Sequence, residues 1–432
     1  MTRLADSTNA QSPETDSEPR VSRWFPGWTM LGISAAAQFM SGPGQSYSVA
    51  AFKEPMRATL DVSETGYSLA YGLATVISGL SLPFTGQFLD RFGARRMLPI
   101  VGASLAVACT TMSQAHTLTA LALGFTLIRC TGQGALTLIG AWIVGEWFLR
   151  RRGLATAIAG LGSSLSVMAF PMLNGWLIDS FGWRNTWLAL ATIVAVTMVV
   201  PVWLILRDRP EELGLLPDGD TAPPVPNSSL ASEIISDPED SWSVSEALRD
   251  ATFWKLLSVP LCSGLVGTGM IFHQVSILSQ RGVSSQAALG LISIQAAIGT
   301  VAALGAGWLA DRIKTERLLA AAMVLLCLSV LVILFMERPV LAFAYAALMG
   351  LHGSILRSAG TVVWVNYYGR KHQGSVRGIS MSMMILAAAF GPLPLAVAQD
   401  QLGDITSALV LFAILPVVAG LLVLTASRPQ RS

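Results

Sequence analysis

The sequence predicts an all-α membrane protein in which twelve spans form two related halves of six helices each. Three observations predict this class: long apolar runs, a one-sided distribution of Lys and Arg, and a motif that recurs between the halves. Only 12% of the 432 residues are charged and 53% are hydrophobic, whereas a soluble protein is usually about a quarter charged. The shortage of charge indicates that lipid surrounds most of the chain.

Apolar runs long enough to cross a bilayer, about 20 residues as a helix, predict the spans. They cover 27–52, 66–89, 97–114, 118–146, 153–179, 184–206, 253–279, 286–310, 318–336, 339–365, 376–399 and 404–426. We expect a disordered tail over 1–26, an N-terminal half over 27–206, a Pro-rich and acidic linker over 207–252, a C-terminal half over 253–426 and a short tail over 427–432.

The Lys and Arg residues alternate between the connections in a way that predicts orientation. With the N-terminus in the cytoplasm, most of the 28 Lys and Arg fall in cytoplasmic segments and few in outer ones. This is the bias expected of membrane proteins. It predicts a multi-pass protein of the cell membrane, a bacterial inner membrane, with both termini in the cytoplasm.

Two short motifs recur at nearly the same offset. The segment from Gly86 to Arg91 follows the second span, and a similar segment from Gly307 to Arg312 follows the eighth, 221 residues later. A Ser-Gly pair at Ser41 in the first span recurs at Ser263 in the seventh. Parallel repeats of six spans place a substrate site between the halves near the midplane.

The segment Gly86-Gln87-Phe88-Leu89-Asp90-Arg91-Phe92-Gly93-Ala94-Arg95-Arg96 resembles the signature loop of the major facilitator superfamily, G-x-x-x-D-R-x-G-R-R/K-R/K. Ala94 stands where the family has its first basic residue, and the second copy lacks the second glycine. The resemblance implies two six-helix bundles related by a pseudo-two-fold axis along the membrane normal. It also implies gating residues, which here are Gly86, Asp90, Arg91, Gly93, Arg95, Arg96, Gly307, Asp311 and Arg312.

The roles of these gating residues differ. The small side chains of Gly86 and Gly307 allow helix backbones to approach closely. By the resemblance, Asp90 binds a neighbouring helix terminus or basic loop of its own half, as a latch that favours one access state. The alternative is that these charges only anchor the topology.

Four further segments are similar to the monocarboxylate and oxalate:formate branch of that superfamily. They are 42–52, 146–155, 207–219 and 367–378. The chain departs from the branch in its charged residues, because the eighth span carries only Gln295 and the eleventh only Arg377 at its start. Monocarboxylate carriers have a first-span Lys, but here Lys53 is expected at or beyond the outer end of the first span. The usual substrate-binding charges of the branch are therefore absent, and its substrates, oxalate or lactate, cannot be carried over.

Ionisable residues at bilayer depth are functional candidates, because charge is costly there. Arg129 lies in the fourth span and Arg357 in the tenth, while every Asp and Glu lies in a tail, a loop or near a span end. A guanidinium without a carboxylate partner is costly to bury, and its planar fork matches a carboxylate. The pattern favours an anionic substrate; alternatively, both arginines bind helix carbonyls and serve structure.

Other polar residues in the spans complete the candidate site. His273 and His352 are proton-coupling candidates, since imidazole titrates near neutral pH. Candidates for substrate contact, each of which could instead join helices, are Gln38, Gln45, Tyr47, Tyr67, Tyr71, Gln133, Gln274 and Gln295.

We therefore expect a secondary transporter that works by alternating access and moves a small, monocarboxylate-like organic anion by proton symport or exchange. An exporter of amphipathic compounds and a membrane sensor without flux are the alternatives. We expect no enzyme activity, no cofactor or metal and no nucleic-acid partner, since there is no ATP-binding loop and the net charge is +2.

Overall fold

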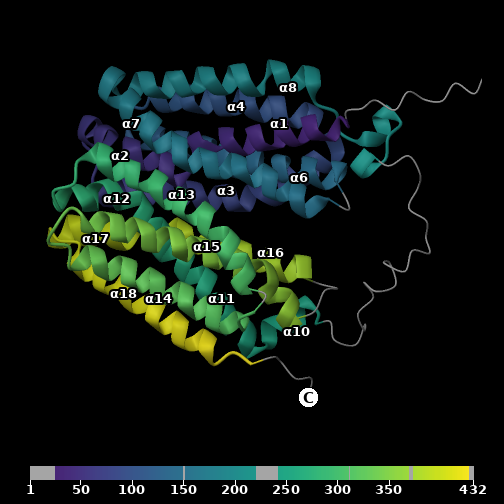
Figure 1. Ribbon diagram of the computed structural model, residues 1–432. Helices are drawn as coiled ribbons and strands as arrows, with labels where there is room; N and C mark the ends of the chain where they lie inside the picture. Colours follow the sequence, from purple (N-terminus) through teal and green to yellow (C-terminus); the bar gives the residue numbers. More distant parts are fainter. Residues whose placement is uncertain (1–24, 149–150, 220–241, 311, 369–372, 428–432) are drawn as a thin grey trace, which may run out of the picture.

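The computed structural model describes residues 25–148, 151–219, 242–310, 312–368 and 373–427, and the regular structure within them is helical. Figure 1 shows the N-terminal half, in purple to teal, beside the C-terminal half, in green to yellow. The helices of both halves run roughly parallel to one common axis. This arrangement confirms the predicted all-α fold.

The N-terminal half contains ten elements in its spans, two of them short irregular turns. They are α1 (Gly27–Met40), η1 (Gly42–Gly44), α2 (Ser46–Leu60), α3 (Glu64–Phe92), α4 (Ala94–Ser113), α5 (Leu118–Ile128), η2 (Arg129–Leu136), α6 (Thr137–Trp147), α7 (Arg152–Met198) and α8 (Val200–Ile205). Two 3-10 turns, η3 (Pro210–Leu213) and η4 (Pro217–Gly219), begin the linker.

The C-terminal half repeats this plan after a short helix, α10 (Val244–Arg249), at the end of the linker. Its elements are α11 (Ala251–Cys262), η6 (Ser263–Gly267), α12 (Thr268–Gln280), α13 (Ser285–Ala310), α14 (Thr315–Leu334), α15 (Leu341–Tyr368), α16 (Gln373–Phe390), α17 (Pro392–Leu402) and α18 (Thr406–Leu424). Each predicted span coincides with one helix or with consecutive helical pieces.

Within the described residues, nine helical stretches are long and apolar enough to cross a membrane by themselves. One of them, Leu154–Ile205, holds two predicted spans, which Gly182 separates with a φ of 78°. The first span is divided between α1 and α2. Irregular backbone at membrane depth is tolerated where protein covers it.

The recurring Ser-Gly pairs mark two of these irregular places. Ser41 precedes η1, and Ser263 opens the π-helical turn η6. A Cβ on Gly42 would lie 2.5 Å from the Phe170 ring, and one on Gly264 would lie 2.5 Å from the carbonyl oxygen of Met384. Both glycines therefore permit a close approach at which a side chain has no room.

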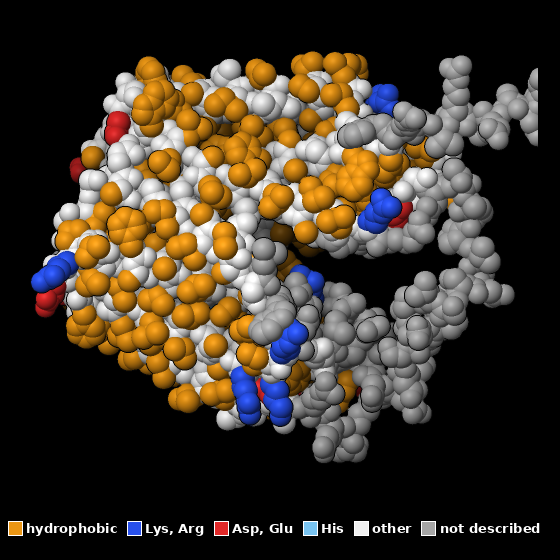
Figure 2. All heavy atoms as spheres, in the orientation of Figure 1, with side chains coloured by type: hydrophobic (Ala, Val, Ile, Leu, Met, Phe, Trp, Pro, Cys, Tyr) orange, Lys and Arg blue, Asp and Glu red, His pale blue; other side chains and the backbone are white. Residues whose placement is uncertain are grey.

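The molecule has two distinct ends along the helix axis. We call one end the linker side: there α1 begins, α18 ends, and η3, η4 and α10 lie (Figure 1). We call the other end, where α2 and α17 end, the far side. Figure 2 shows a hollow between the halves that opens toward the linker side. On the far side, Asp179 of α7 and Gln286 of α13 are joined by a 2.5 Å hydrogen bond.

Contacts between the halves continue from the far side toward the middle of the molecule. The Ser293 hydroxyl donates to the carbonyl oxygen of Met168, and a Cβ on Gly72 of α3 would lie 2.6 Å from the carbonyl oxygen of Ala389 of α16. The structure is therefore closed on the far side and open on the linker side.

Gly162 provides a test of how α7 packs on α1. A Cβ there would lie 2.0 Å from the backbone oxygen of Ala35, whereas a Cβ on Gly160 would meet nothing within 4 Å. We expect Gly162→Ala to destabilise the protein by about 1–3 kcal/mol, the usual cost of overpacking. Thermal unfolding in detergent measures the effect, with Gly160→Ala as the matched control. Equal melting temperatures for the two variants would contradict this packing.

Candidate functional site

The most concentrated group of charges in the described spans lies on the far side between the halves. Lys53 of α2 and Glu64 of α3 are 1% and 3% exposed, and His273 of α12 is 3% exposed. The expected position of Lys53 at or beyond the end of its span is wrong. The apolar run stops at Phe52, but the helix continues to Leu60 and carries Lys53 inside the protein.

Ion pairs and hydrogen bonds connect these residues closely. The Lys53 ammonium lies 2.9 Å from Glu64 Oε2 and 2.9 Å from His273 Nδ1. Arg57 donates to Glu64 Oε1 at 2.7 Å and to Glu54 at 3.3 Å. We call Lys53, Glu54, Arg57, Glu64 and His273 the far-side cluster; it joins α2 and α3 of one half to α12 of the other.

The C-terminal half contributes a further acid, Asp400, to the same part of the far side. Asp400 of α17 accepts hydrogen bonds from the backbone N–H groups of Glu64 at 3.2 Å and Thr65 at 2.7 Å. These N–H groups belong to the first turn of α3, where unpaired donors and the helix dipole favour an anion. The far-side closure therefore combines buried ion pairs with a helix cap that crosses between the halves.

Arg129 lies at the first position of the π-helical turn η2 and is 1% exposed. Its Nη1 donates to the carbonyl oxygen of Gly44 at 3.0 Å, and its guanidinium lies 4.7 Å from the centre of the Tyr71 ring. Its Nε has no hydrogen-bond partner. Among the described residues, no carboxylate forms an ion pair with it.

The sequence explains how the Gly44 carbonyl comes within reach of Arg129. A Cβ on Gly44 would lie 2.2 Å from the Ile128 carbonyl oxygen, and one on Gly132 would lie 3.0 Å from Gly44. Two glycines thus let η1 and η2 touch. The break in the first span leaves the Gly44 carbonyl free, and the Arg129 guanidinium donates a hydrogen bond to it.

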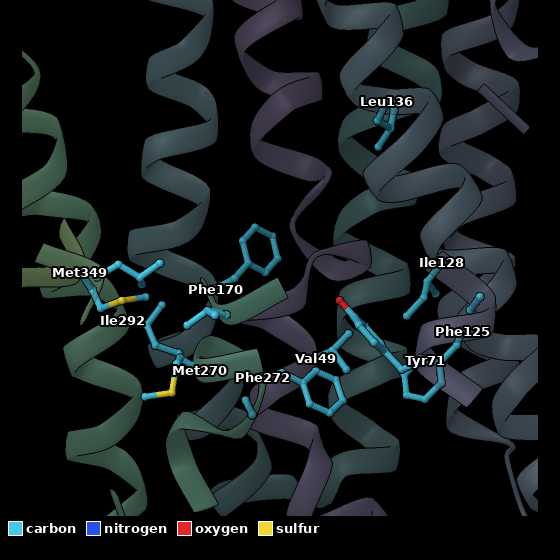
Figure 3. Close-up of a cluster of buried hydrophobic side chains, with 14 of the residues drawn as sticks. Val49, Tyr71, Phe125, Ile128, Leu136, Phe170, Met270, Phe272, Ile292 and Met349 are labelled. Atoms are coloured by element: carbon cyan, nitrogen blue, oxygen red, sulfur yellow. The ribbon is translucent and has the colours of Figure 1, made fainter. Parts of the chain in front are cut away.

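The neighbouring aromatic rings connect Arg129 with the other half. The Tyr71 ring lies 4.5 Å from the Phe272 ring of α12 and 5.7 Å from the Phe125 ring. Figure 3 shows Tyr71 and Phe125 in one buried cluster with Val49 and Phe272. Phe272 adjoins His273, so Arg129 and the far-side cluster border the same contact between the halves.

Three of the remaining polar candidates in the N-terminal half, Gln45, Tyr47 and Tyr71, form hydrogen bonds with nearby serines. Gln45 donates to the Ser41 hydroxyl, and Tyr47 donates to the Ser166 hydroxyl. Gln133 follows Arg129 by one helical turn, and its Oε1 is buried without a hydrogen-bond partner. The Tyr71 hydroxyl shares a 2.5 Å hydrogen bond with Ser46.

In the C-terminal half, two glutamines form one network. Gln274 Oε1 accepts from Gln295 Nε2 at 2.8 Å and from the Tyr345 hydroxyl at 3.1 Å. Gln274 Nε2 donates to the carbonyl oxygen of Ala288. The network joins α12, α13 and α15 directly beside His273.

His352 and Arg357 of α15 lie apart from these groups. His352 Nδ1 bonds the carbonyl oxygen of Ala322 at 2.8 Å, a contact within the C-terminal half. Arg357 is exposed, and its guanidinium reaches the carbonyl oxygen of Gly299 at 3.4 Å. The structure thus brings Arg129, Tyr71 and His273 toward one place and leaves His352 and Arg357 outside it.

The signature loop forms a charged cavity of about 640 Å³ on the linker side. Asp90 accepts a 3.3 Å hydrogen bond from the indole of Trp142, inside α6 of its own half. Asp208 accepts from the backbone N–H of Arg95. Gly93 has a φ of 75°, which favours glycine. The cavity is lined by Asp90, Arg91, Phe92, Gly93, Arg95, Arg96, Trp142, Trp203, Asp208, Arg209 and Glu212.

One expectation for this loop is wrong. A Cβ on Gly86 would meet nothing within 4 Å, so Gly86 marks no close helix approach in this state. In the second copy, Gly307 lies in α13, Arg312 lies in the turn after it, and Asp311 lies outside the described residues.

Two bundles of six spans that meet around buried charges, closed at one end and open at the other, are the architecture of a membrane carrier. Comparison with known proteins agrees. The model of the Major Facilitator Superfamily matches residues 34–342 and 291–432, so the chain belongs to this superfamily. It is a transporter and not an enzyme.

Individual relatives match only parts of their length. The chain is 28% identical to human monocarboxylate transporter 6 over 161 residues, which are 37% of this chain and 31% of the relative. It is 24% identical to the oxalate:formate antiporter of Oxalobacter formigenes over 273 residues, 63% and 60% of the two chains. It is 34% identical to a multidrug resistance protein B homolog of Mycobacterium tuberculosis over 148 residues, 34% and 26% of the two chains.

The fold extends over nearly the whole chain. A bacterial homolog of the human lysosomal transporter Spinster, in an inward-facing and occupied conformation, superposes with a TM-score of 0.72 at 14% identity. The match covers 94% of this chain and 98% of that one.

A double-mutant cycle tests the buried pair of Lys53 and Glu64. Removing one partner of a buried ion pair costs about 3–5 kcal/mol, because the other charge is left uncompensated. We expect Lys53→Met to lower the free energy of unfolding by about 3–5 kcal/mol. The double variant Lys53→Met/Glu64→Gln should recover part of that loss.

Lys255→Met is the control for this cycle, since Lys255 is a half-exposed cation that bonds a single carbonyl oxygen, that of Thr425. Strict additivity of the two single substitutions would show that Lys53 and Glu64 do not stabilise each other.

Proposed function

We propose that this transporter carries a small organic anion, of the monocarboxylate kind, by proton symport or exchange through alternating access. The observation that carries the proposal is the buried guanidinium of Arg129. It has one carbonyl and one aromatic ring as described partners and an unsatisfied Nε. A carboxylate would supply the missing counter-charge and fit the planar fork.

The surroundings of Arg129 support a binding site for a small anion. Its ring partner, Tyr71, packs on Phe272 of the opposite half. Binding of a ligand at Arg129 would therefore depend on the relative position of the two halves. Gln133 and Ser46 add polar groups nearby, while Phe125 and Ile128 are apolar. Such a mixture suits a carboxylate attached to a short organic group.

Lys53 also supports an anionic substrate. Monocarboxylate carriers, which the sequence resembles, have a Lys in the first span. Lys53 is buried in α2, the second helix of the first span here. The similarity to human monocarboxylate transporter 6 and to the oxalate:formate antiporter supports the same substrate class. Arg357 is exposed on α15, apart from these groups, and is not part of the proposed site.

The orientation completes the proposal. The Lys and Arg distribution assigns the linker side to the cytoplasm, so the present state is inward-facing in a cell membrane. Asp90 and its neighbours in the signature loop would form a latch within their own half that favours one access state. In the present state Asp90 bonds Trp142 of that half.

An exporter of amphipathic compounds is the second candidate. The partial similarity to the multidrug resistance protein B homolog favours it. The two candidates differ in their need for Arg129, because an apolar pocket for a large compound tolerates loss of the guanidinium.

Uptake into proteoliposomes tests the proposal with labelled pyruvate, lactate, formate and oxalate. Hydrogen bonds to charged groups contribute about 1.5–3 kcal/mol, so we expect Arg129→Gln to lower carboxylate flux roughly ten- to hundredfold. Uptake is measured under an imposed pH gradient and under exchange conditions.

Arg184→Gln is the matched control. Arg184 also binds backbone carbonyls, those of Ser113 and Ala115, and lies over an aromatic ring, that of Trp183. Both arginines thus make the same kinds of contact, but Arg184 lies away from Tyr71 and Phe272. Equal loss of flux in both variants would assign Arg129 a structural role. Absence of flux with every carboxylate, together with export of a lipophilic dye, would favour the second candidate.

A further inference from the structure

The hydrogen bonds of His273 determine its protonation state in the far-side-closed structure. Its Nε2 lies 3.0 Å from the carbonyl oxygen of Pro392, and its Nδ1 lies 2.9 Å from the Lys53 ammonium. A carbonyl oxygen can only accept and an ammonium can only donate. Nε2 therefore carries the proton, and the bare Nδ1 accepts from Lys53.

A second proton on His273 is incompatible with this arrangement. It would place an Nδ1–H group against an ammonium at hydrogen-bond distance, with two positive charges buried together. The Lys53–His273 bond connects α2 of one half to α12 of the other. Protonation of His273 thus breaks a bond that holds the far side closed.

Charge balance explains when the far side can close again. In the closed structure Lys53 and Arg57 are balanced by Glu54 and Glu64, and His273 is neutral. One added proton leaves one excess positive charge, and one added carboxylate leaves one excess negative charge. Both together restore neutrality, and buried charge is stable only when compensated.

The geometry offers each added group a partner. Glu64 Oε2 lies 3.6 Å from His273 Nδ1, so a protonated His273 can pair with Glu64 after a small movement. Lys53 then releases Glu64 and takes the ligand's carboxylate from Arg129, which borders the same contact between the halves through Tyr71 and Phe272. Arg57 keeps its contacts with Glu54 and Glu64 on the exposed edge of the cluster.

We propose that His273 is the proton-binding residue of a charge-balanced switch, in which one proton on His273 and one carboxylate on Lys53 together replace the Lys53–His273 bond. The proposal rests on the proposed function and decides between its two modes in favour of proton symport. A cluster holding only the proton, or only the carboxylate, cannot close on the far side, and this prevents uncoupled movement of either.

The groups that surround His273 come from three directions. Lys53, Glu54 and Arg57 belong to α2, Glu64 belongs to α3, and α17 contributes the Pro392 carbonyl and Asp400, which caps α3. Glu64 and Asp400 can also bind protons. The experiment must therefore compare the effect of pH with and without His273.

A distance measurement tests the switch without any substrate. Spin labels on Asp179→Cys and Gln286→Cys, in a background in which the four native cysteines are replaced, report the separation of α7 and α13 on the far side. At about pH 8 we expect the short distance, and at about pH 5 we expect a population with a longer distance. With His273→Gln added, pH should no longer shift the distribution.

His352→Gln is the matched control for the distance measurement. His352 is likewise a buried histidine of the C-terminal half bound to a carbonyl oxygen, but it does not contact Lys53. The His352→Gln protein should respond to pH as the parent does. An equal pH response in the His273→Gln protein would overturn the proposal, because Glu64 or Asp400 would then be the proton site.

Flux measurements separate this proposal from the proposed function. With a carboxylate that the parent protein transports, a pH-sensitive dye inside the proteoliposomes should report one proton entering with each anion. His273→Gln should lose both accumulation driven by a pH gradient and exchange at equal pH, because a cluster that holds the carboxylate alone cannot close on the far side. Net carboxylate uptake without proton entry in the parent protein would leave the proposed function standing and refute the switch. If His273→Gln proves inactive or misfolded, the proton-to-anion ratio of the parent protein still decides.

Discussion

The far-side closure depends on compensation of charge that is buried away from water. Lys53 and Glu64 are almost fully covered, and each would be costly without the other. The C-terminal half covers these charges and adds hydrogen bonds, because Lys53 also bonds His273 and the first turn of α3 is capped by Asp400. The halves therefore meet here, and the hollow on the linker side is the counterpart of that closure (Figure 2).

The same requirement explains the irregular backbone of the first span, which faces Arg129 of the fourth. A regular helix uses its own carbonyl groups, so a buried guanidinium needs a carbonyl from a break elsewhere. The turn η1 frees the Gly44 carbonyl, and the glycines at 44 and 132 let it approach Arg129. Arg129 is thereby only partly satisfied. Its remaining capacity to donate hydrogen bonds is what an anion could use, while Tyr71 and Phe272 connect it to the other half.

The sequence predicted the fold well because each span is a long apolar run and the halves repeat. Arg129 could be identified because a charge stands out within such a run. Lys53 and Glu64 were missed for the same reason: each lies just outside an apolar run and looks like an ordinary loop residue. Their burial depends on α2 continuing to Leu60 and on α12 and α17 covering them, which is a tertiary property. Gly86 shows the opposite error, since a family motif implied a contact that this state does not make.

Helix α3 connects the two ends of the carrier. Glu64 is its first residue and Asp90 lies near its last, about 40 Å away along a helix of 29 residues. At the far side α3 is bound to the C-terminal half through Asp400 and at its middle through the contact of Gly72 with Ala389, while Asp90 bonds its own half. Loss of the far-side bonds would let α3 tilt about this middle contact. Such a tilt would connect the far-side cluster to the signature loop at the other end of the same helix.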